Sequence, residues 1–206
     1  MTSPTSRLID KIVALGPQPL LKREGYRKTA RSFHRGAGEV IAVVNFQSSM
    51  WNSPSSARFT VNLSVAVPFF HEKLTGVPFP KNPGSAAPVI TERIGLLTPS
   101  GLDHWWEVTP DTDCAATATD VTSALERYGL PFLDRHLGPE ALATAVQNSA
   151  FLRTNDAIAQ AIFLSYLGRR EAARGVLSAA IASNTHAGFG NTLRLISTRL
   201  GFESAT

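Results

Sequence analysis

The chain has 206 residues, a formal net charge of +4, 43% hydrophobic residues and 17% charged residues. This composition excludes an intrinsically disordered chain, because it supplies enough apolar side chains for a core. The uninterrupted apolar runs are far shorter than the roughly 20 residues that span a bilayer, so we expect no membrane contact. The single cysteine, Cys114, excludes an internal disulfide and a cysteine-based zinc cluster, and we therefore expect a cytoplasmic protein.

The first half of the chain is predicted to form one helix and then an antiparallel sheet. Apolar residues at helical spacing predict a helix over residues 5–15, which Gly16-Pro17 ends. A short helical turn is expected over residues 19–24, and a loop over residues 75–88, which contain four prolines. Extended patterns predict about five strands, at residues 26–35, 39–48, 58–67, 89–97 and 104–108. The first two are expected to form a hairpin with its turn at Gly36-Ala37-Gly38.

The second half is predicted to be helical. A helix that starts at Asp113 or Thr119 is expected to run to Tyr128, where Gly129-Leu-Pro131 should break it. Further helices are predicted at residues 139–147, 155–167, 169–183 and 190–200. The expected fold class is α+β. An antiparallel sheet domain over residues 1–135 carries an Ala-rich helical annex, residues 136–206, packed on it, or the whole chain forms one domain.

The catalytic and cofactor-binding motifs with well-understood mechanics are absent from the sequence. It has no phosphate-binding GxxxxGK[ST] loop, no dinucleotide-binding GxGxxG, no HExxH and no GxSxG. The five histidines are spread along the chain without the spacing of metal ligands, so we expect no metal and no cofactor. A carboxylate next to a thiol, as in Asp113-Cys114, disfavours the reactive thiolate, which argues against a cysteine nucleophile.

Strand alternation gathers polar side chains on one face of the predicted sheet. Phe59, Val61 and Leu63 share one side of their strand, and amides and cations occupy the other. Such a face can bind a carboxylate, a phosphate, a base or a peptide segment. The alternative is that the C-terminal helices cover the face and its amides satisfy backbone groups. The candidate ligand-binding residues are Asn45, Gln47, Arg58, Asn62, Arg93 and Trp106.

An ordered series of motifs is similar to an uncharacterised bacterial family of domains of unknown function. The series is Gly25-Tyr26 with basic residues, Val43-Val-Asn45-Phe-Gln47, Phe59-Thr-Val-Asn62-Leu63, Arg93-Ile-Gly95 and Trp105-Trp106. Gly129-Leu-Pro131-Phe132-Leu133 is similar to the segment that follows in longer members. The resemblance covers about residues 20–135. It implies an α+β fold with an antiparallel sheet and supplies no activity.

We therefore predict a non-enzymatic binding module that uses the polar face for a protein or a small-molecule ligand. One alternative is an enzyme acting on a small or phosphorylated substrate near Glu92, Arg93 and Glu107. Another is a nucleic-acid-binding protein that uses the basic residues 22–35, which hold six Lys and Arg and one acidic residue. The oligomeric state stays open.

Overall fold

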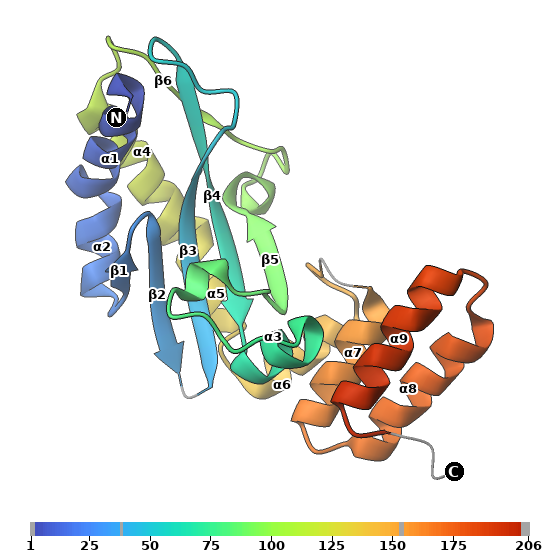
Figure 1. The fold of residues 1–206 in the computed structure, drawn as a ribbon. Helices are drawn as coiled ribbons and strands as arrows, with labels where there is room; N and C mark the ends of the chain where they lie inside the picture. Colours follow the sequence, from blue (N-terminus) through green and yellow to red (C-terminus); the bar gives the residue numbers. More distant parts are fainter. Residues whose placement is uncertain (1–2, 38, 153–154, 203–206) are drawn as a thin grey trace. The chain divides into compact units, whose positions relative to one another are not determined.

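A computed structural model of the chain describes residues 3–37, 39–152 and 155–202. It combines an antiparallel sheet with an N-terminal helix and C-terminal helices (Figure 1), which confirms the predicted class. The chain divides into two compact units. The first comprises Met1–Ala37, Ile41–Ser64 and Glu92–Arg135, and the second comprises Gly38–Val40, Val65–Thr91 and His136–Thr206. The predicted division into residues 1–135 and 136–206 remains a prediction.

The described strands form a six-stranded sheet in the order β1-β2-β3-β4-β5, and β6 pairs with β4. Both β1 with β2 and β4 with β6 are antiparallel. Phe59 lies opposite Trp106, and Arg58 lies opposite Glu107. The strands are β1 (Arg27–Thr29), β2 (Ser32–Ala37), β3 (Val40–Ser48), β4 (Ala57–Ala66), β5 (Ile90–Arg93) and β6 (Trp106–Val108).

The single strand predicted over residues 26–35 is wrong, because the segment forms a hairpin. Thr29 pairs with Ser32 across a turn at Ala30 and Arg31, and Ala30 adopts a φ of 53°. An alanine rarely occupies this left-handed region, so the turn lacks the glycine or asparagine that usually announces a hairpin. The predicted turn at residues 36–38 includes Gly38, which lies outside the described residues, and Gly36 and Ala37 belong to β2.

The helices of the first unit are α1 (Pro4–Leu15), α2 (Pro17–Arg23), α4 (Cys114–Ala124) and α5 (Leu130–Arg135), and a π-helical turn over Leu125–Gly129 joins α4 to α5. Asp113 caps α4, since its side chain accepts the backbone N–H groups of Ala115 and Ala116 at 2.9 and 3.0 Å.

The helix break predicted at Gly129-Leu-Pro131 is wrong, because the chain continues from α4 into α5. Proline has no N–H and its ring clashes with the carbonyl four residues earlier in an α-helix. The wider π turn, which bonds residues five apart, relieves this conflict. A Cβ on Gly129 would lie 3.2 Å from Cδ2 of Leu125, so the turn packs tightly at this glycine.

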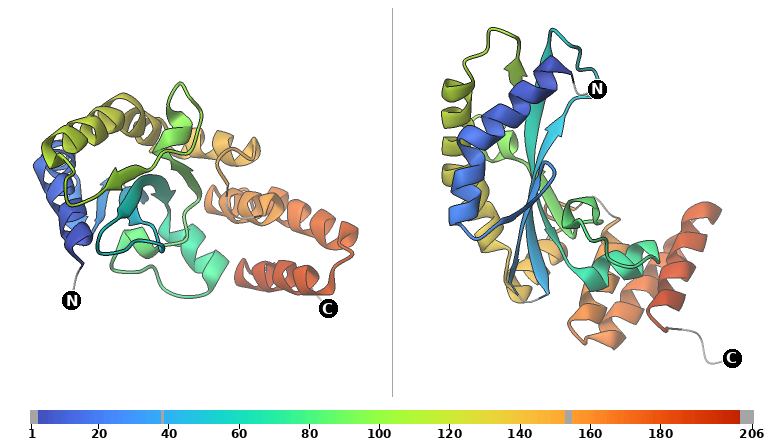
Figure 2. Two further views of the ribbon diagram at one scale, coloured as in Figure 1. Left: turned by 90° about the horizontal axis from the view of Figure 1, so that it is seen from above. Right: turned by 60° about the vertical axis from the view of Figure 1, so that its left-hand side comes forward.

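Helices α1, α2 and α4 lie on one face of the sheet (Figure 2), and this face carries the aliphatic and aromatic side chains of the strands. Phe33 and Phe46 meet edge to face with ring centres 5.8 Å apart. Phe59 stacks on Trp106 at 5.5 Å. Burial of each such side chain contributes on the order of 2 kcal/mol, so this layer stabilises the first unit.

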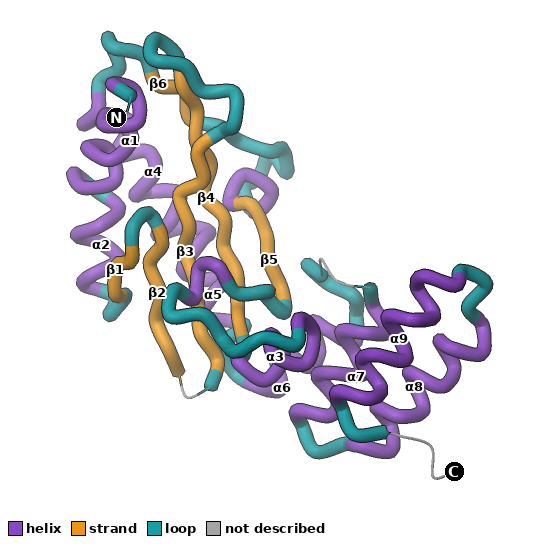
Figure 3. The backbone as a smooth tube through the Cα atoms, viewed as in Figure 1, coloured by secondary structure: helices purple, strands orange, loops and turns teal. Residues whose placement is uncertain are grey.

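The second unit is mainly helical. Its described helices are α3 (Pro68–Thr75), a 3-10 turn η1 (Pro83–Ser85), α6 (Pro139–Gln147), α7 (Asp156–Tyr166), α8 (Arg170–Ser183) and α9 (Ala187–Arg199) (Figure 3). The four C-terminal helices lie close to their predicted positions, whereas α3 was not predicted. No helix in the described ranges is long and apolar enough to cross a membrane.

Two helix ends of the second unit cap each other. Arg199 at the end of α9 donates to the carbonyl oxygens of Lys73 and Leu74 at 3.3 and 2.5 Å, and Nζ of Lys73 donates to the carbonyl oxygen of Arg199 at 2.9 Å. The last carbonyls of a helix have no partner within the helix, and cations are favoured there. This reciprocal pair fixes α3 to α9.

The predicted loop at residues 75–88 is attached to α3. Buried His71 accepts the backbone N–H of Ala87 on Nδ1 at 2.9 Å, and its ring meets that of Phe79 edge to face at 5.6 Å. The backbone N–H of Phe79 donates to Glu72 at 3.4 Å. These contacts therefore hold the loop against α3 within the second unit.

Candidate functional site

The amides on the polar face of the sheet bond mainly to other side chains of that face. Nδ2 of Asn62 donates to Oε1 of Gln47 at 2.6 Å, and Nδ2 of Asn45 donates to Oγ of Ser32 at 2.9 Å. These pairs show that the predicted alternation is correct for the two central strands. Gln47 is exposed, and Asn45 and Asn62 are half-buried.

Two arginines of the polar face lie over one indole. The guanidinium carbons of Arg58 and Arg93 are each 5.1 Å from the ring centre of Trp105. Arg93 also forms an ion pair with Asp103, and the same carboxylate oxygen accepts Nε1–H of Trp105 at 2.9 Å. Arg93, Asp103 and Trp105 thus form one connected group that fixes the loop before β6.

Gly95 brings that loop close to the 3-10 turn Ile94–Leu97, called η2, which replaces the end of the strand predicted over residues 89–97. A Cβ at Gly95 would lie 2.6 Å from the carbonyl oxygen of Leu102 and would collide with the backbone nitrogen of His104. Thr60 of β4 donates to the carbonyl oxygen of His104 at 2.8 Å. The Arg93-Ile-Gly95 motif therefore has a physical reason: its first and last residues hold the loop.

The predicted site residue Trp106 lies on the aliphatic side of the sheet, apart from the amides. Only 7% of it is exposed, it stacks on Phe59, and its Nε1–H donates to Asp120 of α4 at 2.7 Å. The ring of His104 meets it edge to face at 4.5 Å. Trp105, which the sequence analysis did not select, is the tryptophan beside Arg58 and Arg93.

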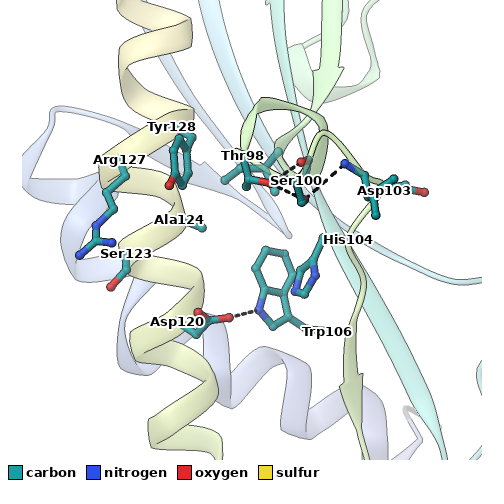
Figure 4. Close-up of a pocket in the computed structure, with 13 residues that line it drawn as sticks. Thr98, Ser100, Asp103, His104, Trp106, Asp120, Ser123, Ala124, Arg127 and Tyr128 are labelled. Atoms are coloured by element: carbon teal, nitrogen blue, oxygen red, sulfur yellow. Dashed lines mark hydrogen bonds between the residues drawn. The ribbon is translucent and has the colours of Figure 1, made fainter.

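A cavity of about 480 Å³ opens on this side between the loop, β6 and α4 (Figure 4). Trp106, His104 and Tyr128 face it from opposite walls, and Asp120 and Ser123 line it from α4. Figure 4 shows Arg127 on the helix side, with the guanidinium directed away from Trp106. Other lining residues are Ile94, Gly95, Thr98, Ser100, Leu102, Asp103 and Ala124.

Some polar groups of the cavity form hydrogen bonds within the protein, and others are available to bind a ligand. Oγ1 of Thr98 donates to the carbonyl oxygen of Gly95 at 2.7 Å and lies 2.9 Å from Oγ of Ser100, so these hydroxyls fix the loop. The hydrogen bonds found among the described residues leave the side chains of Tyr128 and Ser123 free to contact a ligand. The cavity therefore offers aromatic surface together with donors and acceptors of hydrogen bonds.

Two titratable groups elsewhere in the first unit have shifted pKa values. Burial raises the pKa of Tyr26 to about 12, against the opposing effect of the Arg35 guanidinium 4.8 Å from its ring. Burial, aided by the charge of Arg27, lowers the pKa of His34. The Tyr26 hydroxyl and Nδ1 of His34 are buried without a hydrogen-bond partner among the described residues. Both shifts follow from poor solvation of the charged form.

The basic residues 22–35 bond largely to the protein itself. Arg31 forms an ion pair with Asp10 at 2.6 Å and donates to Ser6 and Ser48, and Arg35 forms an ion pair with Asp134. Arg23 contacts Glu126, and Lys28 donates to Gln18. These contacts favour a structural role for this segment over phosphate binding.

The carboxylates of the enzyme alternative differ in their surroundings. Oε1 of Glu92 accepts the backbone N–H of Arg93 at 2.7 Å, whereas Glu107 is exposed on β6 opposite Arg58. Within the described ranges, no three His, Cys, Asp or Glu residues are grouped as a metal site.

Sequence reasoning missed the cavity because its walls come from distant segments. Asp120, Ser123 and Tyr128 follow helical spacing on α4 and the π turn, but nothing in that spacing names the loop that they face. Gly95 was the available signal, since an isolated glycine in a strand pattern indicates a close backbone approach.

Comparison with known proteins identifies the family of the chain. No curated protein and no solved structure is similar to the chain. A family model described as a domain of unknown function, DUF4304, matches residues 17–135. The match spans more than half of the chain and includes β1 to β6, the loop around Gly95 and the cavity. The chain therefore belongs to the DUF4304 family of domains of unknown function.

Proposed function

We propose that this protein is a non-enzymatic binding module that holds a small ligand in the cavity beside Trp106. The observation that carries the proposal is the cavity itself, whose volume of about 480 Å³ falls within the range of roughly 300–1,000 Å³ typical of ligand sites. Its walls combine aromatic rings with a few polar groups, which is the usual composition of such sites. A cytoplasmic setting, expected from the lone cysteine, belongs to the same proposal.

The chemistry of the walls favours a flat ligand with polar substituents. Tyr128 and His104 offer ring surface and hydrogen-bonding atoms, and Asp120 retains acceptor capacity beyond its bond to Trp106. Hydrogen bonds between lining residues include those from Thr98 to Gly95 and from Trp106 to Asp120. They hold the walls in place, which suits binding rather than the nucleophile–base pairing of covalent catalysis.

The polar face contributes to this proposal in an indirect way. Arg93 holds Asp103, and Asp103 belongs to the cavity wall, so Arg93 acts as a positioning residue. Direct ligand contact by Asn45, Gln47, Arg58, Asn62 and Arg93 stays a prediction. The side-chain pairing of the amides supports a structural contribution from them.

The test is a ligand screen in which binding is detected by the NMR signal of a residue that lines the cavity. The indole N–H signal of Trp106 is followed by NMR while aromatic acids, nucleosides and monosaccharides are added. Compounds that bind should shift this signal. Binding should be lost in Ala124→Phe, which fills the cavity, and retained in the matched control Ala116→Phe, which lies exposed on the same helix.

Two results would contradict the proposal. One is a panel in which no compound shifts the Trp106 signal. The other is a set of compounds that bind both phenylalanine variants equally, because such compounds occupy a different surface. Circular dichroism of each variant confirms that the helix is intact before binding is compared.

A further inference from the structure

The loop between β3 and β4 is held rigidly. The side chain of Asn52 accepts the backbone N–H of Arg58 at 2.9 Å and donates to the carbonyl oxygen of Arg58 at 3.1 Å. Ser53 and Ser56 are bonded through their backbones at 2.8 Å, and Oγ1 of Thr5 donates to the carbonyl oxygen of Ser53 at 2.7 Å. These contacts join both ends of the loop and tie it to α1, so the loop presents its tip in a defined position.

Two large apolar side chains are exposed to solvent at that tip. Met50 is 87% exposed and Trp51 is 80% exposed, the highest exposures among the large apolar residues described. The hydrogen bonds of the loop fix its backbone and so fix where these two side chains leave the chain. Tryptophan and methionine are enriched at protein–protein interfaces, and tryptophan is a frequent energetic centre of such contacts.

Two residues of opposite charge lie beside the apolar tip. Arg58 and Glu107 are directly opposite in the β4–β6 ladder and share with Trp51 the lining of a shallow hollow of about 260 Å³. Both charged residues are exposed, and no ion pair among the described residues includes either of them. The guanidinium of Arg58 stacks over Trp105, with its carbon 5.1 Å from the ring centre. The hollow thus presents one unpaired cation and one unpaired anion next to an apolar anchor.

We propose that this patch, formed by Met50, Trp51, Arg58 and Glu107, binds the same patch of a second copy of the chain. A two-fold axis requires a self-complementary surface, in which residue i meets residue j and residue j meets residue i. Arg58 of each copy would face Glu107 of the other, and the Met50–Trp51 tips would pack together. A partner protein whose surface carries charges of one sign would attract only one of Arg58 and Glu107 and repel the other. The same patch on a second copy carries both signs, which favours a second copy as the occupant.

The first test is the oligomeric state of the full chain. Sedimentation velocity over a series from low to high micromolar concentration should show a dimer in the wild-type protein. Trp51→Ser should raise the dissociation constant at least about tenfold. The matched control Leu195→Ser, at another exposed apolar position, should leave it unchanged. A wild-type protein that stays monomeric throughout the series overturns the proposal and leaves the patch to a different partner.

Charge reversal tests the geometry of the contact. Arg58→Glu alone and Glu107→Arg alone should each be monomeric, because each places like charges across the two-fold axis. An equimolar mixture of the two variants should form a heterodimer, because every reversed residue then faces its opposite. Lys22→Glu, a reversal at an exposed position outside the patch, should dimerise like the wild type. If the mixture stays monomeric while both variants are folded, Arg58 and Glu107 do not meet across the interface.

Discussion

Replacement of Tyr26 by phenylalanine is expected to stabilise the protein, and to do so more strongly at alkaline pH. The Tyr26 side chain is 3% exposed, and its hydroxyl has no hydrogen-bond partner among the described residues. A buried polar group without a partner costs about 1–3 kcal/mol relative to its hydrated state. Phenylalanine removes that group and keeps the ring beneath Arg35, so at neutral pH we expect a gain of about 1 kcal/mol in the free energy of unfolding.

The alkaline effect follows from the raised pKa. The tyrosine loses its proton near pH 10 in the unfolded chain and near pH 12 in the folded protein. Between these values the unfolded state binds fewer protons, so the stability of the wild type falls as the pH rises. The loss is about 1 kcal/mol at about pH 10.5 and approaches about 3 kcal/mol above pH 12. Phenylalanine does not titrate and avoids this loss.

The assay is urea denaturation of both proteins at several pH values between neutrality and about pH 10.5. The difference between the two free energies is the quantity to follow, because the other titrating groups are common to both proteins and cancel. A variant less stable than the wild type at neutral pH would refute the assignment of an unpaired hydroxyl. A difference that stays constant with pH would refute the burial that raises the pKa.

Three further substitutions test the fold. Gly95→Ala should lower the free energy of unfolding by about 3 kcal/mol, because the Cβ of the alanine meets the backbone of the following loop. An unchanged melting temperature would contradict this close approach. Arg199→Ala should cost about 2 kcal/mol in urea denaturation through two uncapped carbonyls, whereas Arg194→Ala on the same helix should change stability by less than about 0.5 kcal/mol. Burial and the charge of Arg27 lower the pKa of His34 in the folded state, so the wild-type protein should lose stability as the pH falls below about 6.5. His34→Gln should lose less stability over the same pH range. Equal pH dependence of the two proteins would argue against the lowered pKa of His34.

The sequence predicted elements well where local signals agree with tertiary structure. Pro139 at the first turn of α6 and the apolar spacing behind it gave both ends of that helix correctly. The alternation in β4 placed Phe59 on the buried side and Asn62 on the other. Such patterns are readable because the period of a strand or a helix repeats over many residues.

The errors lie where one or two residues decide the structure. The hairpin at Ala30 turns through a left-handed alanine, for which the sequence carries no turn signal. The helix continues past Pro131 because a π turn accommodates the proline, which the residue type alone does not indicate. The candidate site shows the same difference between a repeating pattern and a single decisive contact. The polar face came from alternation and was predictable, whereas the cavity depends on how the loop after Gly95 meets α4 and was not.

The π turn at Leu125–Gly129 makes the length of this segment informative in other members of the family. A π turn holds one residue more than the α-helical path between the same two ends. Removal of that residue would restore a regular α-helical path between the same two ends, so the chain beyond it would keep its orientation relative to α4. The side chains of Leu130 and Leu133 would therefore stay in the core, and only the side chains within the turn would change their positions. A family member that is one residue shorter here would keep α5 in place but have a different wall at the position of Tyr128, and a sequence alignment would reveal it.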